Sequence, residues 1–226
     1  MTDKWKTLRE CCLFENMGDS EFEDFVRKYS ERLLCRKFET GETVFHVSDE
    51  AKQMAVILSG RIKVEKLLPN GSYLTIAVKK CGDMIGEAAV FSRIALYPCE
   101  ITAEAESELV FINKEVMLML LSEYPDTLVC FLTELSSMTY ALQQRVELLS
   151  YSGICEKIAF FLLSQYKVTN DTRIRIPGSI TIMSEQLKVS RTSLHREMTK
   201  LKKQNIIAIE KGYIRILDIA ALNKLL

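Results

Sequence analysis

The side chains best suited to chemistry lie near the carboxyl end of the chain, where cationic and hydroxyl residues alternate with leucine and methionine. Arginine can donate two parallel hydrogen bonds to a guanine edge or hold a phosphate, and serine or threonine can bond phosphate or contact a thymine methyl group. Such residues bind a polyanion rather than transform it. The side chains that we expect to contact DNA are Ser190, Arg191, Thr192, Ser193, His195, Arg196, Lys202 and Lys211, although His195 and the two lysines could equally face only solvent.

Two predicted helices position these side chains. Residues 184–187 begin a short helix, residues 188–190 form a turn, and residues 191–203 continue as a longer helix, which is helix-turn-helix spacing. Ser190 is a suitable N-cap, so Arg191, Thr192 and His195 fall in the first turns, the part that reaches base edges in a major groove. The apolar residues that bury the opposite face are Leu187, Val189, Leu194, Met198 and Leu201.

A β-hairpin follows the longer helix. Residues 206–209 and 214–217 are apolar runs joined by a turn at residues 210–213, which predicts a wing. Charge supports the same reading, because residues 153–226 hold 13 Lys and Arg against 6 Asp and Glu, a net charge of +7. Residues 1–152 hold 17 against 24, a net charge of −7. A basic segment gains affinity for nucleic acid by releasing condensed counterions, although a solvated basic face would look the same.

The first half of the chain reads as all-β. Between residues 38 and 113, short apolar or alternating runs are separated by glycine, and Pro69-Asn70-Gly71 is a turn between two of them. About eight strands in a small roll or barrel are expected. Ahead of the roll, residues 19–34 have helical periodicity, with Asp19 or Ser20 available as N-cap.

After Pro125 the spacing of apolar residues changes to alternating steps of four and three, which is a heptad seam with one polar member. Such a seam predicts parallel dimerisation, and the alternative is a helix that packs only on its own β-domain. The predicted dimer contacts are Leu128, Leu132, Leu135, Thr139, Leu142, Val146 and Leu149.

This combination resembles the Crp/Fnr transcription regulators over nearly the whole chain. The resemblance rests on the heptad helix, on residues 189–196 with the wing, and on the glycine-punctuated roll: Gly41-Glu42, Ser59-Gly60, Gly82-Asp83 and Gly86-Glu87-Ala88. It implies an α+β homodimer that reads a palindromic operator near promoters. An effector-sensing cyclic-nucleotide-binding-type β-roll (a jelly roll) would occupy residues 1–125, a long dimerisation helix residues 126–152, and a winged helix-turn-helix residues 153–226.

Three departures from the family pattern carry expectations. The acidic residue that reads cytosine in relatives is replaced by Thr192, and Lys188 replaces the usual turn glycine. Cyclic-AMP-binding members clamp the cyclic phosphate with an Arg-Ser pair, which would fall here on Pro98-Cys99, so we expect an apolar or anionic effector other than cyclic AMP. The expected effector contacts are Gly86, Glu87, Ala88, Pro98, Cys99, Met138 and Leu142.

Other classes of protein fit the sequence less well. Seven cysteines at irregular spacings leave a thiol-redox sensor open, but they do not reproduce the tight N-terminal cluster of the iron–sulfur members. The sequence contains neither a nucleophile elbow nor a phosphate-binding loop, so we do not expect an enzyme. His46 is a lone histidine, which we expect to be neither a metal ligand nor a haem ligand. A ligand-binding module without a DNA role is the remaining rival. The charged start and the lack of a long apolar run favour a cytoplasmic protein without cofactor or membrane contact, and contact with RNA polymerase stays open.

Overall fold

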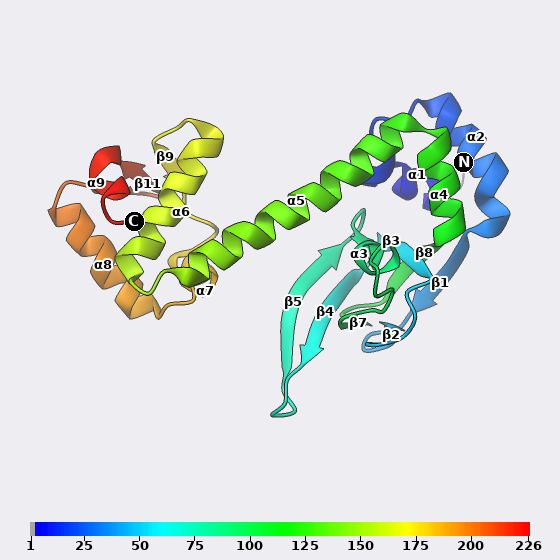
Figure 1. The fold of residues 1–226 in the computed structure, drawn as a ribbon, viewed down its shortest axis with the longest axis horizontal. Coiled ribbons are helices and arrows are strands. Elements are labelled where there is room, and N and C mark those ends of the chain that lie inside the picture. Colours follow the sequence, from blue (N-terminus) through cyan, green and yellow to red (C-terminus); the bar gives the residue numbers. More distant parts are fainter. Residues whose placement is uncertain (1–2) are drawn as a thin grey trace. The chain divides into compact units, whose positions relative to one another are not determined.

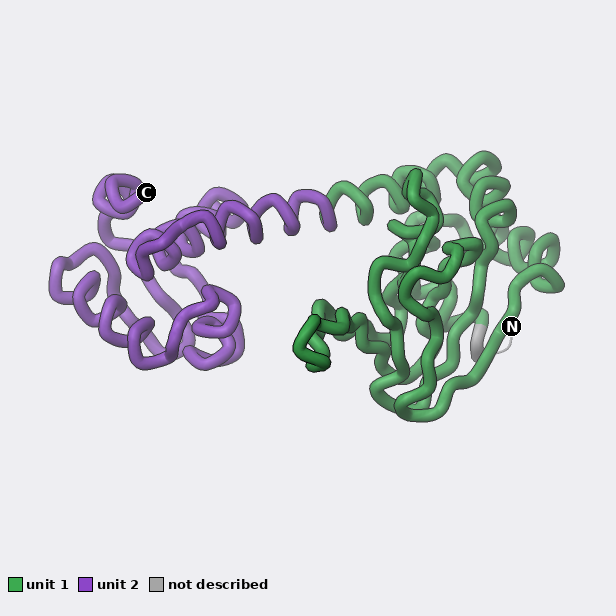
Figure 2. The backbone as a smooth tube through the Cα atoms, turned by 60° about the horizontal axis from the view of Figure 1, so that its bottom comes forward, with its two compact units in different colours: residues 1–137 green, residues 138–226 purple. Residues whose placement is uncertain are grey.

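The structure is a computed structural model that describes residues 3–226. The chain forms two compact units, unit 1 (Met1–Ser137) and unit 2 (Met138–Leu226) (Figure 2). Unit 1 contains an antiparallel β-roll, unit 2 contains a winged helix-turn-helix, and helix α5 (Pro125–Ser150) is shared between them. The predicted fold class is therefore confirmed. Over residues 3–226 no single helix has the length and apolar character of a membrane span, although α4 and α5 pass that test together as a bent pair.

Unit 1 is built on two four-stranded antiparallel sheets (Figure 1). The first has the strand order β1-β8-β3-β6 and the second the order β2-β7-β4-β5. These eight strands agree with the number expected. Their bounds are β1 Leu34–Phe38, β2 Thr43–Phe45, β3 Gln53–Ser59, β4 Arg61–Leu67, β5 Tyr73–Lys80, β6 Met84–Ile85, β7 Glu100–Ala103 and β8 Ser107–Asn113.

The core of unit 1 joins strands β3 and β8 to the N-terminal helices and to α4. Residues 54–58 of β3 are all buried, which explains why this strand reads as a continuous apolar run instead of an alternating one. Gly60 follows at a φ of +86°, and a Cβ there would lie 2.3 Å from the carbonyl oxygen of Glu106. Glycine is therefore needed both for the backbone conformation and for the close approach. The predicted turn at residues 69–71 joins β4 to β5, as expected.

The helices of unit 1 outside α5 are short. Four precede the strands, α1 Asp3–Arg9, η1 Cys12–Phe14, α2 Asp19–Tyr29 and η2 Ser30–Arg32, and two lie later in the chain, α3 Glu87–Val90 and α4 Lys114–Glu123. The helix predicted over residues 19–34 was too long, because Leu34 already belongs to β1. The predicted N-caps Asp19 and Ser20 were also wrong. Gly18 occupies that position, and its backbone N–H donates to Glu21 Oε2 at 2.9 Å.

Unit 2 holds α6 Ile154–Thr169, β9 Arg173–Arg175, α7 Ile180–Gln186, α8 Arg191–Lys203, β10 Ile207–Glu210, β11 Tyr213–Ile216 and α9 Ile219–Asn223. Its three strands form an antiparallel sheet in the order β10-β11-β9. Helix α7 begins four residues earlier than predicted, because the Ser179 hydroxyl accepts a hydrogen bond from the Ile182 N–H at 3.2 Å and caps it. Ser184, which we expected to open this helix, lies buried near its end.

Candidate functional site

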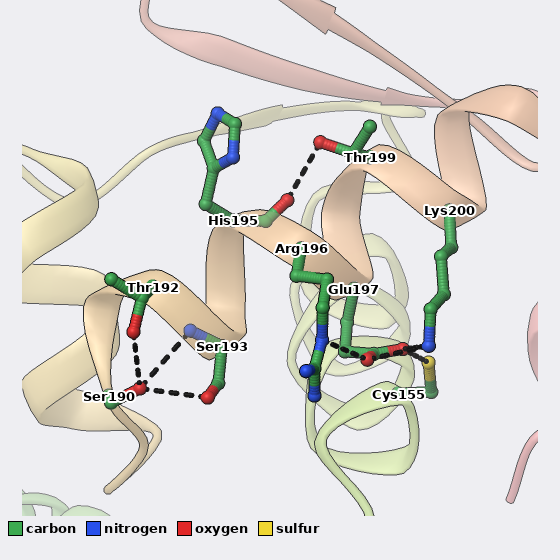
Figure 3. Close-up of polar contacts among 9 residues, drawn as sticks. All are labelled: Cys155, Ser190, Thr192, Ser193, His195, Arg196, Glu197, Thr199 and Lys200. Atoms are coloured by element: carbon green, nitrogen blue, oxygen red, sulfur yellow. Dashed lines mark hydrogen bonds and ion pairs between the residues drawn. The ribbon is translucent and has the colours of Figure 1, made fainter.

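Helix α8 begins and ends where the sequence predicts. The Ser190 hydroxyl accepts a hydrogen bond from the Ser193 N–H at 3.1 Å and contacts the Thr192 and Ser193 hydroxyls (Figure 3). This cap satisfies one of the unpaired N–H groups of the first turn. The apolar residues of the helix, Leu194, Met198 and Leu201, are at most 2% exposed and lie in the core of unit 2.

The opposite face of α8 gathers the predicted DNA contacts. Each residue turns the helix by about 100°, so side chains three, four and seven positions apart share a face. Arg191 and Lys202 lie along one edge of this face, and both are exposed. The face itself carries Thr192, His195, Arg196, Thr199 and Lys203, of which all but the half-buried Thr199 are exposed.

A buried carboxylate holds one edge of this face in place. Glu197 accepts from Arg196 Nε at 3.2 Å and from Lys200 Nζ at 2.8 Å, and Cys155 Sγ of α6 donates to it at 3.2 Å (Figure 3). The hydrogen bond from Lys200, followed by that from Cys155, lowers the pKa of Glu197 to about 2. Glu197 therefore stays ionised and orients the guanidinium of Arg196, which is itself 68% exposed.

Sequence reasoning missed this role of Glu197. One signal was available, because on a helical projection Glu197 falls beside Leu194 and Leu201 on the buried face, where an unpaired carboxylate would be costly. Cationic residues stand next to it and three positions on, at Arg196 and Lys200. The thiol of Cys155 could not have been assigned, since it comes from another helix.

The wing presents Lys211 at its tip. Lys211 and Gly212 form the two-residue loop between β10 and β11, and Gly212 has a φ of +79°. Next to this loop, Glu210 pairs with Arg215 and, at 3.1 Å, with Arg173, whose guanidinium lies 4.2 Å from the centroid of the Tyr213 ring. The hairpin is thus braced, and the lysine is left exposed.

The heptad residues of α5 lie mostly at the surface of the single chain. Leu132, Leu142, Val146 and Leu149 are 52–64% exposed, and Leu128 is 37% exposed. Thr139 is exposed as well, whereas Leu135 packs partly against the core of unit 1. Leucines exposed at heptad spacing on one helix are typical of a surface that meets another helix.

A cavity of about 250 Å³ opens in unit 1 where the N-terminal segment, the β5–β6 turn, α3 and α5 meet. Of the predicted effector contacts, only Glu87 lines it. Gly86, Ala88, Pro98 and Cys99 lie in the same unit but outside its lining, and Met138 and Leu142 belong to unit 2. The lining residues are Glu10, Cys12, Glu15, Lys79, Cys81, Gly82, Asp83, Met84, Glu87 and Glu134.

All seven cysteines are free thiols. The hydrogen bond between neighbouring Cys11 and Cys12 lowers the pKa of Cys12 and raises that of Cys11. Burial, with the hydrogen bond to Glu197, raises the pKa of Cys155 to about 11. Within residues 3–226 no three His, Cys, Asp or Glu side chains are grouped so as to hold a metal ion, and His46 pairs with Glu100 at 2.9 Å.

Known proteins match both units. The family model of the cyclic nucleotide-binding domain matches residues 35–124, and that of the Crp-like helix-turn-helix domain matches residues 156–225. The global nitrogen regulator of Synechococcus elongatus is 24% identical over 207 residues, which are 85% of this chain and 89% of that protein.

Two solved structures share the fold. The catabolite activator protein of Thermus thermophilus superposes with a TM-score of 0.56 at 17% identity, covering 95% of this chain and 97% of its own. CprK in complex with OCPA gives 0.59 at 21% identity, covering 88% and 92%. Because the two family models match in the order of the two units, and because a curated regulator aligns along most of its length, this chain belongs to the Crp/Fnr family of transcription regulators.

Proposed function

We propose that this protein is a homodimer that reads a palindromic DNA operator through α8 of each protomer, under the control of a small effector other than cyclic AMP. In this division of labour residues 1–125 sense the effector, residues 126–152 form the dimer and residues 153–226 bind DNA. One observation carries the proposal. The apolar face of α8 is buried in unit 2, and its opposite face offers hydroxyl, imidazole and guanidinium groups to solvent.

Each exposed group then has a role on DNA. Arg191 and Arg196 donate to guanine O6 and N7 or to phosphate, and Thr192 replaces a carboxylate that would select cytosine. Ser190, Ser193 and His195 contact phosphate or base edges near the start of the helix. Lys202 on α8 and Lys211 on the wing bind phosphates, which adds affinity without sequence preference.

Dimerisation follows from the exposed seam on α5. A palindromic operator mirrors the two-fold symmetry of its protein, and the two recognition helices must lie about 34 Å apart, one turn of DNA. An effector that changes the angle between the paired α5 helices would change that separation and so the affinity. The effector would shift the equilibrium between a DNA-binding conformation and a non-binding one. The size of that shift is set by the difference in effector affinity between the two conformations.

The lining of the cavity argues against cyclic AMP. A cyclic phosphate needs a cationic partner, and the described lining offers one lysine, Lys79, among five carboxylates. Neither Pro98 nor Cys99 can supply the missing guanidinium. The effector is therefore of another class.

Two further assignments complete the proposal. Binding to chromosomal DNA places the protein in the cytoplasm, and contact with RNA polymerase is expected where the operator adjoins a promoter. The related proteins are transcription regulators, so we assign no enzymatic activity. A thiol-redox sensor remains the second candidate, because the lowered pKa of Cys12 increases the share of the reactive thiolate.

Selection from a random pool of duplex DNA tests the proposal. The purified protein should enrich a palindrome whose half-sites are separated by about one helical turn, roughly 10 base pairs centre to centre. Enrichment of a single half-site would remove the dimer from the proposal. Recovery of no sequence, with or without added metabolites, would remove DNA recognition.

A further inference from the structure

The cavity of unit 1 is strongly acidic. Five carboxylates line it, against one lysine, Lys79, and they come from four parts of the chain: Glu10 and Glu15 near the N-terminus, Asp83 before β6, Glu87 on α3 and Glu134 on α5. At about 250 Å³ the cavity is slightly smaller than typical ligand pockets of 300 Å³ or more. Its charge and size point to a small, positively charged occupant.

Glu87 gives this charge a specific target. The residue is only 3% exposed, and its Oε2 atom is buried with no hydrogen-bond partner in the described chain. A buried polar atom without a partner is costly, and native proteins rarely leave one. Glu87 lines the cavity, and a small rotation of its side chain that turns Oε2 toward the cavity would let a ligand N–H supply the missing bond.

Neighbouring charges reinforce the preference. Burial raises the pKa of Glu87, and Glu134 and Asp83 add to this rise, whereas the hydrogen bond to its own backbone and the charge of Lys79 act in the opposite direction. Glu134 also acts on the thiol of Cys12, which places that carboxylate at the cavity as well. Without a ligand, these groups disfavour a charged Glu87. A bound cation would have the opposite effect, because its positive charge favours the ionised form of each carboxylate around it.

We propose that the effector of this regulator is a small organic cation, a primary amine or guanidinium compound, whose N–H groups donate to Glu87 and Glu134. The inference rests on the proposed function, since it names the effector class of that site. It replaces the apolar or anionic effector expected from the sequence. An anion would face five carboxylates. A bare metal ion lacks a set of three converging ligands in residues 3–226, whereas a molecule with spread N–H donors can reach carboxylates that lie apart.

Calorimetric titration of the full chain without DNA tests this inference. The probes are putrescine and agmatine, and 1,4-butanediol and succinate serve as neutral and anionic controls of similar length. We expect saturable binding of at least one cation at one site per protomer, and none of either control. Glu87→Gln should weaken binding roughly 10- to 100-fold, because a hydrogen bond to a charged group is lost.

Two further variants keep the result interpretable. Glu134→Gln should also weaken binding, and it tests the inference independently should Glu87→Gln fail to fold. The matched control Glu106→Gln removes an exposed carboxylate from unit 1 outside the cavity and should leave the affinity unchanged. Absence of saturable binding by both cations, or equal affinity in all three variants, would overturn the inference. Because no DNA is present, that failure is distinct from a failure of operator binding.

Discussion

Replacing Leu142 by alanine should weaken the dimer without disturbing the fold of the protomer. Leu142 belongs to the α5 seam, and 64% of its surface is exposed in the single chain. Full burial of a leucine side chain stabilises by about 1.5–3 kcal/mol, so burial of the exposed part contributes about 1–2 kcal/mol per protomer. Two symmetric copies give about 2–4 kcal/mol per dimer, and the dimer Kd should rise roughly 30- to 700-fold.

Tyr140 on the same helix supplies the matched control. It is 58% exposed and offers a larger side chain, but it lies outside the heptad seam. Sedimentation equilibrium over a range of concentrations gives the Kd of wild type, Leu142→Ala and Tyr140→Ala. Only Leu142→Ala should shift it. An unchanged Kd for Leu142→Ala, or an equal loss for Tyr140→Ala, would refute the seam. Leu135 is a poorer test, because it also packs against unit 1.

Three further predictions concern stability and reactivity. Ser190→Ala removes the cap of α8 and should lower the free energy of unfolding by about 1 kcal/mol. The midpoint of thermal unfolding of unit 2 should then fall by roughly 4–8 °C, and an unchanged midpoint would contradict the capping bond. Gly60→Ala should destabilise unit 1 more than Gly71→Ala in urea titration, because both have a positive φ but only Gly60 meets backbone within 3 Å; equal losses would argue against the close approach. Iodoacetamide reacts with the thiolate, so it should label Cys12 at a lower pH than Cys155, which should be labelled only as the pH rises toward 11; labelling of Cys155 as early as Cys12 in peptide mass spectra would contradict its contact with Glu197.

The recognition helix could be predicted to the residue because its signals are local. A capping serine at position 190 precedes apolar residues spaced four and three apart, and those two features set the start and the buried face. The start of α7 was missed because Ile180, Ile182 and Met183 form an apolar run without an evident period. Ser179 could be recognised as the N-cap only from the structure, in which its hydroxyl accepts a hydrogen bond from the Ile182 N–H.

The acidic cavity could not be predicted, because its carboxylates are brought together only by the fold. Glu10 and Glu134 lie at opposite ends of unit 1 in the sequence, and no spacing pattern links them. The family resemblance did point to Glu87, one of its members. The same limit applies to Glu197, whose contact with Cys155 joins two helices of unit 2.

Operator affinity as a function of salt tests the central claim, that α8 grips duplex DNA through its exposed cationic face. The selected duplex is titrated at several salt concentrations with the wild type, Arg196→Ala and a control, Lys167→Ala. The control removes an exposed lysine of α6. Arg196→Ala should lose about 1–3 kcal/mol of binding free energy, with a shallower salt dependence if Arg196 also neutralises a phosphate. Lys167→Ala should match wild type. Full affinity in Arg196→Ala, or affinity that does not fall as salt rises in the wild type, would contradict the claim.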